Sequence, residues 1–175
     1  MIHDASSAPA TDLVDALFGL RPDTPLHALR HAREKVVSAT QGCQQLFFQP
    51  AEGERPTLAE RYLVAWYASE LSQVPEFIEH YRAAALAEGH SAARLTALAA
   101  AADAAIGLRE RALLSFTRTL ILNPAEGGQA ALAELQAAGL VTEEIVVLAQ
   151  LVSYLAYQLR LGAGLRALRA AGEQR

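Results

Sequence analysis

Helix start and stop signals recur along the whole sequence, and no segment alternates apolar and polar residues as a half-buried strand would. The clearest signal is Thr57 three residues before Glu60, a capping box in which each side chain bonds a free backbone N–H of the other residue. Alanine and leucine, both strong helix formers, are abundant, and hydrophobic residues make up 52% of the chain. The sequence therefore predicts an all-α fold.

Caps, glycines and prolines divide the chain into separate helices. The first is expected after a cap at Thr11 or Asp12, and the stretch 25–50 forms one helix or two, with a break at Gly42. The last long helix begins at Thr142, whose cap is reinforced by the two acidic residues that follow it. The remaining helices are expected at 57–71, 75–88, 91–105, 108–124 and 128–139.

The length fits one compact domain, because a single hydrophobic core commonly serves about 100 to 200 residues. Residues 1–10 lack periodicity and are expected to form a loose N-terminal arm. A linker with two prolines and a glycine then separates an N-terminal helical cap, 11–50, from the main helical domain, 55–172.

Charge and hydropathy limit the partners. The net charge is −4 and the arginines are scattered, so no positive stripe is available for nucleic acid phosphates. The most apolar run, 145–159, is shorter than the roughly 20 residues that span a bilayer, and polar residues interrupt it. The N-terminal residues lack the basic and apolar segments of a secretory signal. These features predict a cytoplasmic protein that binds neither nucleic acid nor membrane.

The chain has one cysteine, Cys43, and one lysine, Lys35. A single cysteine excludes an intrachain disulfide, a two-cysteine redox pair and a thiolate-rich zinc site. Lys35 lies in "REKVVS", which offers neither an apolar pocket for a Schiff base nor a glycine-rich loop for phosphate. No cofactor is expected.

Two stretches carry a family resemblance: "TLAERYLVAWYASEL" with "VPEFIEHYRAAALAEG", and "RERALLSFTRTLILNP" with the last long helix. Over about residues 55–170 the sequence resembles the carboxymuconolactone decarboxylase and alkylhydroperoxidase D-like superfamily, and its second half looks close to the peroxidase-related branch. The resemblance implies an orthogonal helical bundle, here with an N-terminal helical extension. It also implies a homodimer or a higher oligomer such as a trimer or hexamer.

In its peroxidase branch the family has a Cys-x-x-Cys-x-x-x-His helix and a glutamate on the preceding helix. With Gly89 as the anchor, the cysteine positions fall on Val74 and Phe77, the histidine position on Tyr81 and the glutamate position on Tyr62. A shift of one residue also places no thiol in the motif. The two-cysteine peroxidase mechanism, which needs a thiolate and a resolving thiol, is therefore excluded.

The replaced positions have two interpretations. Val74, Phe77 and Tyr81 share one helical face and would meet Tyr62 and Trp66 across a hairpin. This set could be a former site filled by core packing, which we favour. It could instead form a pocket for a flat apolar ligand, with the tyrosine hydroxyls as polar contacts.

His80 is a candidate general base for a cofactor-free decarboxylase or lactone-handling enzyme, because Glu76 or Glu79 could fix its tautomer. Tyr81 and Tyr62 are its candidate partners in such Tyr/His acid-base catalysis. The decarboxylase branch lacks the cysteine pair, and "PEFIEHYRAAALAEG" resembles its corresponding helix. On this helix, however, His80 points about 100° away from the position of the family's histidine. A solvated polar face is the preferred interpretation of these charges.

Two further features have more than one interpretation. His27, His31 and Glu34 have a spacing that can bind zinc, but no further ligand is identifiable, so we predict a polar outer face and no metal site. Cys43 follows a glycine among apolar residues and is expected to be a buried small hydrophobe, although a weak one-cysteine peroxidase would have to use it.

The last long helix carries a polar stripe of Gln150, Tyr154 and Gln158 on an otherwise apolar surface. Buried amides need partners, so the stripe either lines a cavity, with Tyr154 as a ligand contact, or pairs across a subunit interface. We expect the interface. Taken together, the sequence predicts a homo-oligomeric family member that binds a small apolar ligand or acts as an accessory protein, with the two enzymatic alternatives left open.

Overall fold

The computed structural model describes residues 12–100 and 106–173, and in these ranges the chain is helical without strands. The all-α prediction is confirmed. The expected arm at 1–10, the possible cap Thr11 and the expected end of one helix at Ala105 lie outside the described residues. The helices are α1 Leu13–Phe18, α2 Pro25–His31, α3 Glu34–Phe48, α4 Leu58–Ser72, α5 Pro75–Ala87, α6 Ala92–Ala99, α7 Leu108–Leu122, α8 Gln129–Ala137 and α9 Thr142–Glu173, with a 3₁₀ turn at Pro124–Glu126.

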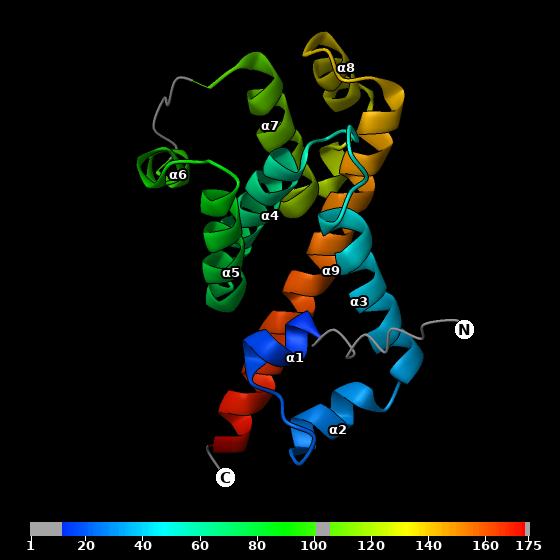
Figure 1. Cartoon of the computed structure of the whole chain (residues 1–175), viewed down its shortest axis with the longest axis vertical. Coiled ribbons are helices and arrows are strands. Elements are labelled where there is room, and N and C mark those ends of the chain that lie inside the picture. Colours follow the sequence, from blue (N-terminus) through cyan, green and yellow to red (C-terminus); the bar gives the residue numbers. More distant parts are fainter. Residues whose placement is uncertain (1–11, 101–105, 174–175) are drawn as a thin grey trace, which may run out of the picture.

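Helix α9 runs along most of the molecule (Figure 1). Helices α7 and α8 lie at its beginning, α4 crosses it, and α1 and α2 lie near its C-terminal end. Helices α4 and α5 form an antiparallel hairpin against this scaffold. The N-terminal helices share one continuous hydrophobic core with the rest, because Val14, Phe18 and Phe47 belong to the same buried cluster as Leu63 and Leu155.

Local sequence signals explain several helix ends. Thr57 Oγ1 accepts from the Glu60 N–H at 3.3 Å and the Thr57 N–H donates to Glu60 Oε2 at 2.8 Å, so the predicted capping box is present. Helix α5 ends just before Gly89, whose φ of 95° is readily adopted only by glycine. These signals depend on short-range geometry and are therefore readable from the sequence.

The prediction of a break at Gly42 is wrong. Gly42 lies inside α3, and the break falls at Ala32 and Arg33, where Arg33 has a non-helical φ of −127° and ψ of 71°. The two helices have different partners: Arg30 of α2 is ion-paired to α1, whereas Phe47 of α3 is buried in the core. This packing outweighs the roughly 1 kcal/mol that a glycine costs within a helix.

Helix α9 begins at Thr142, as predicted, but its cap differs from the prediction. Val141, not Thr142, holds the cap position: its carbonyl accepts the first helical bond from Ile145, and its N–H donates to Glu144 Oε2 at 3.0 Å. The reinforcing acid was identified correctly, but the residue that it caps was placed one position too late.

Helix α9 satisfies the length and composition of a membrane-spanning helix over Thr142–Gly172, with a mean hydropathy of 1.4 in its most apolar window. Half of that window is buried inside the protein, and Leu148, Leu151 and Leu155 are fully buried core residues. A core helix has the same pattern, and the packing of α9 gives it that role here.

Candidate functional site

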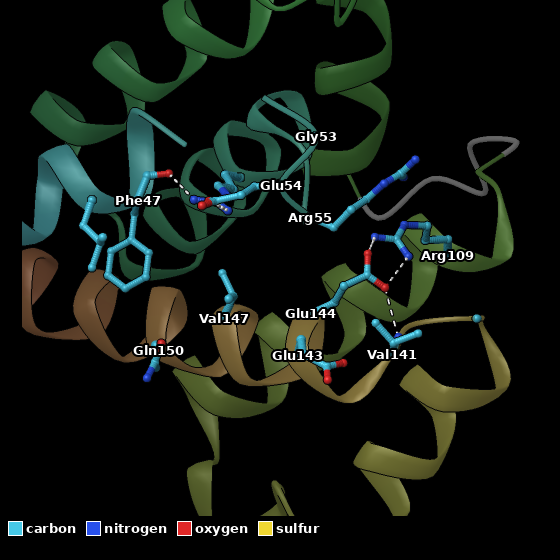
Figure 2. A pocket seen from close by; sticks show the side chains of 13 residues that line it. Phe47, Gly53, Glu54, Arg55, Arg109, Val141, Glu143, Glu144, Val147 and Gln150 are labelled. Atoms are coloured by element: carbon cyan, nitrogen blue, oxygen red, sulfur yellow. Dashed lines mark hydrogen bonds and ion pairs between the residues drawn. The ribbon is translucent and has the colours of Figure 1, made fainter. Parts of the chain in front are cut away.

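A pocket of about 830 Å³ opens between the end of α3, the loop 49–57 and the first turns of α7 and α9 (Figure 2). Its apolar wall consists of Leu46, Phe47, Val141 and Val147. The rest of the lining is polar or glycine: Gly53, Glu54, Arg55, Arg61, Arg109, Gly139, Glu143, Glu144 and Gln150. The pocket therefore has an apolar side around Phe47 and Val147 and a charged side around Arg109, where Val141 lies beside Glu144 (Figure 2).

Arg109 bridges two carboxylates on the charged side. Its Nε lies 2.6 Å from Glu60 Oε1 and its Nη2 lies 2.6 Å from Glu144 Oε1. Glu60 also caps α4 and Glu144 caps α9, as Figure 2 shows for the bond that the Val141 N–H donates to Glu144. Arg109 itself lies in the first turn of α7. Three helix N-termini thus meet at one guanidinium.

These contacts set the ionisation of the two acids. Burial raises the pKa of Glu60, but its hydrogen bonds from Arg109 and from the Thr57 N–H outweigh burial, so the net pKa is lowered. The pKa of Glu144 is lowered chiefly by its hydrogen bond from Arg109. Both carboxylates are ionised and engaged at neutral pH, so neither is a free general base.

Arg61 forms the second charged contact and is only 1% exposed. Its Nε donates to the Pro56 carbonyl at 2.8 Å, its Nη1 to the Phe47 carbonyl at 2.9 Å and its Nη2 to Glu54 Oε2 at 3.1 Å. Each of its three nitrogens donates to a protein oxygen, so Arg61 holds the loop 49–57 against the end of α3.

The Arg109 cluster predicts a specific acid response. Because the folded pKa values of Glu60 and Glu144 lie below their ordinary 4.5, their contribution to stability is present above that pH and is lost as pH falls through the folded values. We expect Arg109→Met to lower the free energy of unfolding by about 2 kcal/mol at pH 7 and to flatten its decline below pH 4.5. Urea unfolding at several pH values measures both effects.

Arg111→Met is the control, because Arg111 is an exposed neighbour on the same helix with no ion pair among the described residues. A decline below pH 4.5 that is equally steep in Arg109→Met and in wild type would contradict the assigned role of this cluster.

The site residues predicted on α4 and α5 lie in the core. Val74, Phe77, Tyr81 and Trp66 are at most 1% exposed, and the Tyr62 and Tyr81 rings are 6.5 Å apart, so the predicted meeting of these two tyrosines across the hairpin is confirmed. Their proposed catalytic and ligand-binding roles stay predictions.

Phe48 of α3 packs against both tyrosine rings. Its ring lies 4.8 Å from that of Tyr62 and 5.3 Å from that of Tyr81, so the three rings form one aromatic cluster. Sequence reasoning missed Phe48 because the contact joins helices that are distant in the chain. The arrangement supports packing as the interpretation of the replaced motif positions.

Tyr81 belongs to a buried chain of hydrogen bonds. The Tyr81 hydroxyl donates to Gln158 Oε1 at 2.6 Å, Gln158 Nε2 donates to the Tyr154 hydroxyl at 2.8 Å, and that hydroxyl donates to Gln44 Oε1 at 2.9 Å. Burial raises the pKa of Tyr81 well above its ordinary value, so its hydroxyl stays protonated at neutral pH. In this series of hydrogen bonds each buried polar group has a partner, and the donors point from Tyr81 toward Gln44.

This network corrects the expectation for the polar stripe of α9. Tyr154 and Gln158 find their partners within the chain rather than across a subunit interface, because α3 brings Gln44 to them. Gln150, the third member, is exposed and lines the pocket. The stripe was recognised in the sequence, but the partner that satisfies it lies more than 100 residues away.

His80 is half-buried, and burial lowers its pKa, so its imidazole is neutral at pH 7. Among the described residues, neither Glu76 nor Glu79 makes a hydrogen bond to it, and Glu76 Oε1 instead lies 3.7 Å from Arg166 Nε. The carboxylate that would fix its tautomer is therefore not in place. Cys43 is half-buried on α3 and packs against the core.

The charged pocket was not predicted from the sequence. The Thr57–Glu60 pair and Glu144 were identified, but only as helix caps, and nothing in the pattern around Arg109 indicates that it joins them. Arg61 lies on a helix face that sequence reasoning left unassigned.

The sequence matches no protein-family model and no curated protein. A crystal structure of an uncharacterized peroxidase-related protein from Silicibacter sp. TM1040 is similar to this chain, with a TM-score of 0.68 and 15% sequence identity. The similarity covers 77% of this chain and 70% of that chain. At this identity it establishes the fold: the chain is an all-helical protein with a peroxidase-related fold.

Proposed function

We propose that this chain is a non-peroxidatic member of the carboxymuconolactone decarboxylase and alkylhydroperoxidase D-like superfamily that binds a small, largely apolar molecule. The observation that carries the proposal is the pocket beside Phe47 and Val147. Its volume of about 830 Å³ falls within the roughly 300–1,000 Å³ typical of small-molecule sites. The apolar wall would take the body of the ligand.

The charged side of the pocket favours binding over catalysis. Glu144 and Arg61 are engaged within the protein, so they shape the pocket without offering a reactive group. Arg55 and Glu143, in contrast, are exposed and make no ion pair among the described residues. These two side chains can contact a polar end of the ligand and so fix its orientation.

Blocking the apolar wall tests this proposal. Val147 lines the pocket, whereas Val146, its neighbour, is 49% exposed and does not. We expect Val147→Trp to weaken binding of a small aromatic or aliphatic probe at least about tenfold, because the indole fills the space that the ligand needs. Val146→Trp should bind like wild type. Ligand-observed NMR with a fragment set, followed by calorimetry, measures both variants.

If the folded wild-type protein binds no member of the fragment set, or if Val147→Trp binds as tightly as Val146→Trp, the pocket is not the ligand site. Circular dichroism establishes that each variant is folded before the comparison is made.

The proposed lack of peroxidase chemistry gives a second test. We expect an organic hydroperoxide to oxidise Cys43 in the native protein no faster than it oxidises free cysteine, because the family's thiol positions are occupied by the buried Val74 and Phe77. Intact mass after timed exposure measures the rate. A reaction orders of magnitude faster would move the active site to α3 and favour the one-cysteine peroxidase instead.

A cofactor-free enzyme is a second candidate function, and the neutral, half-buried imidazole of His80 is the observation that favours it. In that case turnover of a lactone substrate would show a pH–rate limb that disappears in His80→Ala. Equal activity of His80→Ala and wild type would remove this candidate.

Self-association is also part of the proposal. Large apolar side chains are exposed on several helices: Leu29, Val36, Leu46, Leu108, Leu122, Leu132, Val146 and Leu168. A second copy of the chain would remove some of this surface from water. Light scattering coupled to size exclusion would show a homodimer or higher oligomer, and a monomer at high concentration would contradict it.

A further inference from the structure

Three potential metal ligands from two helices converge at one point. His31 Nε2 of α2 lies 2.8 Å from Asp15 Oδ2 of α1, and His27 Nε2 lies 3.9 Å from the same oxygen. The three ligand atoms lie within 4.8 Å of one another, and all three residues are half-buried. The two imidazole rings stack with centroids 3.9 Å apart, so both Nε2 atoms face the carboxylate.

This spacing suits a small divalent ion. Ligand atoms at about 2.0–2.2 Å from a tetrahedral zinc ion are separated from each other by roughly 3.4 Å. The separations of 2.8 Å and 3.9 Å from Asp15 Oδ2 lie on either side of that value, so rotations of the side chains are enough to reach it.

The surrounding groups hold the ligands in a suitable orientation. His31 Nδ1 lies 3.1 Å from Glu34 Oε2, the carboxylate contact that commonly orients a metal-binding imidazole. Arg30 Nη1 donates to Asp15 Oδ1 at 2.8 Å, which leaves Oδ2 for the metal. His31 and Asp15 are therefore each held in place by a hydrogen bond to a residue that would not contact the metal.

The local charge also favours a cation. Asp12, Asp15 and Glu34 carry three negative charges and the buried Arg30 carries one positive charge, so the formal sum is −2 before the histidines are counted. A divalent ion would balance that sum. Arg30 Nη1 also lies 3.4 Å from His31 Nε2, so the alternative to a metal site is an ion-paired clamp between α1 and α2.

We propose that Asp15, His27 and His31 bind one divalent transition metal ion, with Zn²⁺ as the preferred ion. Two imidazoles and a carboxylate are ligands that Zn²⁺ and Co²⁺ share, and three protein ligands leave a position open for water. The ion would join α1, a helix of six residues that is too short to be stable alone, to α2. This inference is independent of the ligand proposed for the pocket.

The test is a Co²⁺ titration of the chelator-treated full chain, followed by visible absorption, with Zn²⁺ as competitor. We expect one Co²⁺ per chain, displaced by Zn²⁺, and a higher melting temperature with Zn²⁺. His27→Ala should weaken Co²⁺ binding by more than about 100-fold. Loss of a residue that only hydrogen-bonds to a metal ligand commonly costs about 10–100-fold, and loss of a ligand should cost more. Glu34→Gln should weaken Co²⁺ binding by about 10–100-fold.

His90→Asn is the control, because His90 is a half-buried histidine that contacts the Ala59 carbonyl and lies outside the cluster. His27→Ala leaves the ion pair between Arg30 and Asp15 intact, so the variant is expected to fold. The absence of a Co²⁺ spectrum in folded wild-type protein would mean that the cluster binds no metal and only links α1 to α2 through ion pairs. Unchanged binding in His27→Ala would place the metal elsewhere, and either result overturns the proposal.

Discussion

Arg61→Ala is expected to lower the free energy of unfolding by about 3–5 kcal/mol, one of the two largest single-residue effects that we predict for this protein. Arg61 is 1% exposed and donates to the carbonyls of Phe47 and Pro56, both in buried residues. Truncation leaves both carbonyls without a donor and opens a cavity beneath the loop. Urea unfolding at pH 7 measures the loss.

Two further variants identify the cause. Arg61→Lys keeps the charge but lacks the planar fork that serves three acceptors, so it should recover only part of the stability. Arg118→Ala removes an exposed arginine from α7 and should change the free energy of unfolding by no more than about 0.5 kcal/mol. A loss below about 1 kcal/mol in Arg61→Ala would mean that the loop is held by other contacts.

Phe77→Ala is expected to lower the free energy of unfolding by a similar amount, about 3–5 kcal/mol. Phe77 is fully buried, its ring lies 5.6 Å from that of Phe18 and 6.0 Å from that of Tyr81, and it packs on α9 at Gly162. A Cβ at Gly162 would lie 2.8 Å from the Phe77 ring, so this glycine permits the close approach. Truncation would leave a cavity between α1, α5 and α9.

Leu108→Ala is the control for this experiment, because Leu108 is 75% exposed and its truncation removes little buried surface. The comparison also tests the interpretation of the replaced motif. If Phe77→Ala costs no more than Leu108→Ala, the position is not a packed core site, and a ligand pocket beside Tyr62 and Tyr81 becomes the better interpretation.

Much of the secondary structure could be predicted from the sequence, because its causes are local. The capping box at Thr57 and Glu60, and the stop at Gly89, depend on contacts within a few residues. The break near Gly42 was mispredicted because tertiary packing of α3 outweighs a weak local preference.

The sequence by itself also determined which chemistry this protein lacks, since a chain with one cysteine cannot have a two-cysteine peroxidase site. It did not determine which side chains come together. Arg109 meets Glu60 and Glu144 across 49 and 35 residues, and Asp15 meets His31 across 16, with no periodicity to indicate either contact. Only the tertiary structure decided these clusters, because the way helices pack depends on the whole core and not on any one segment.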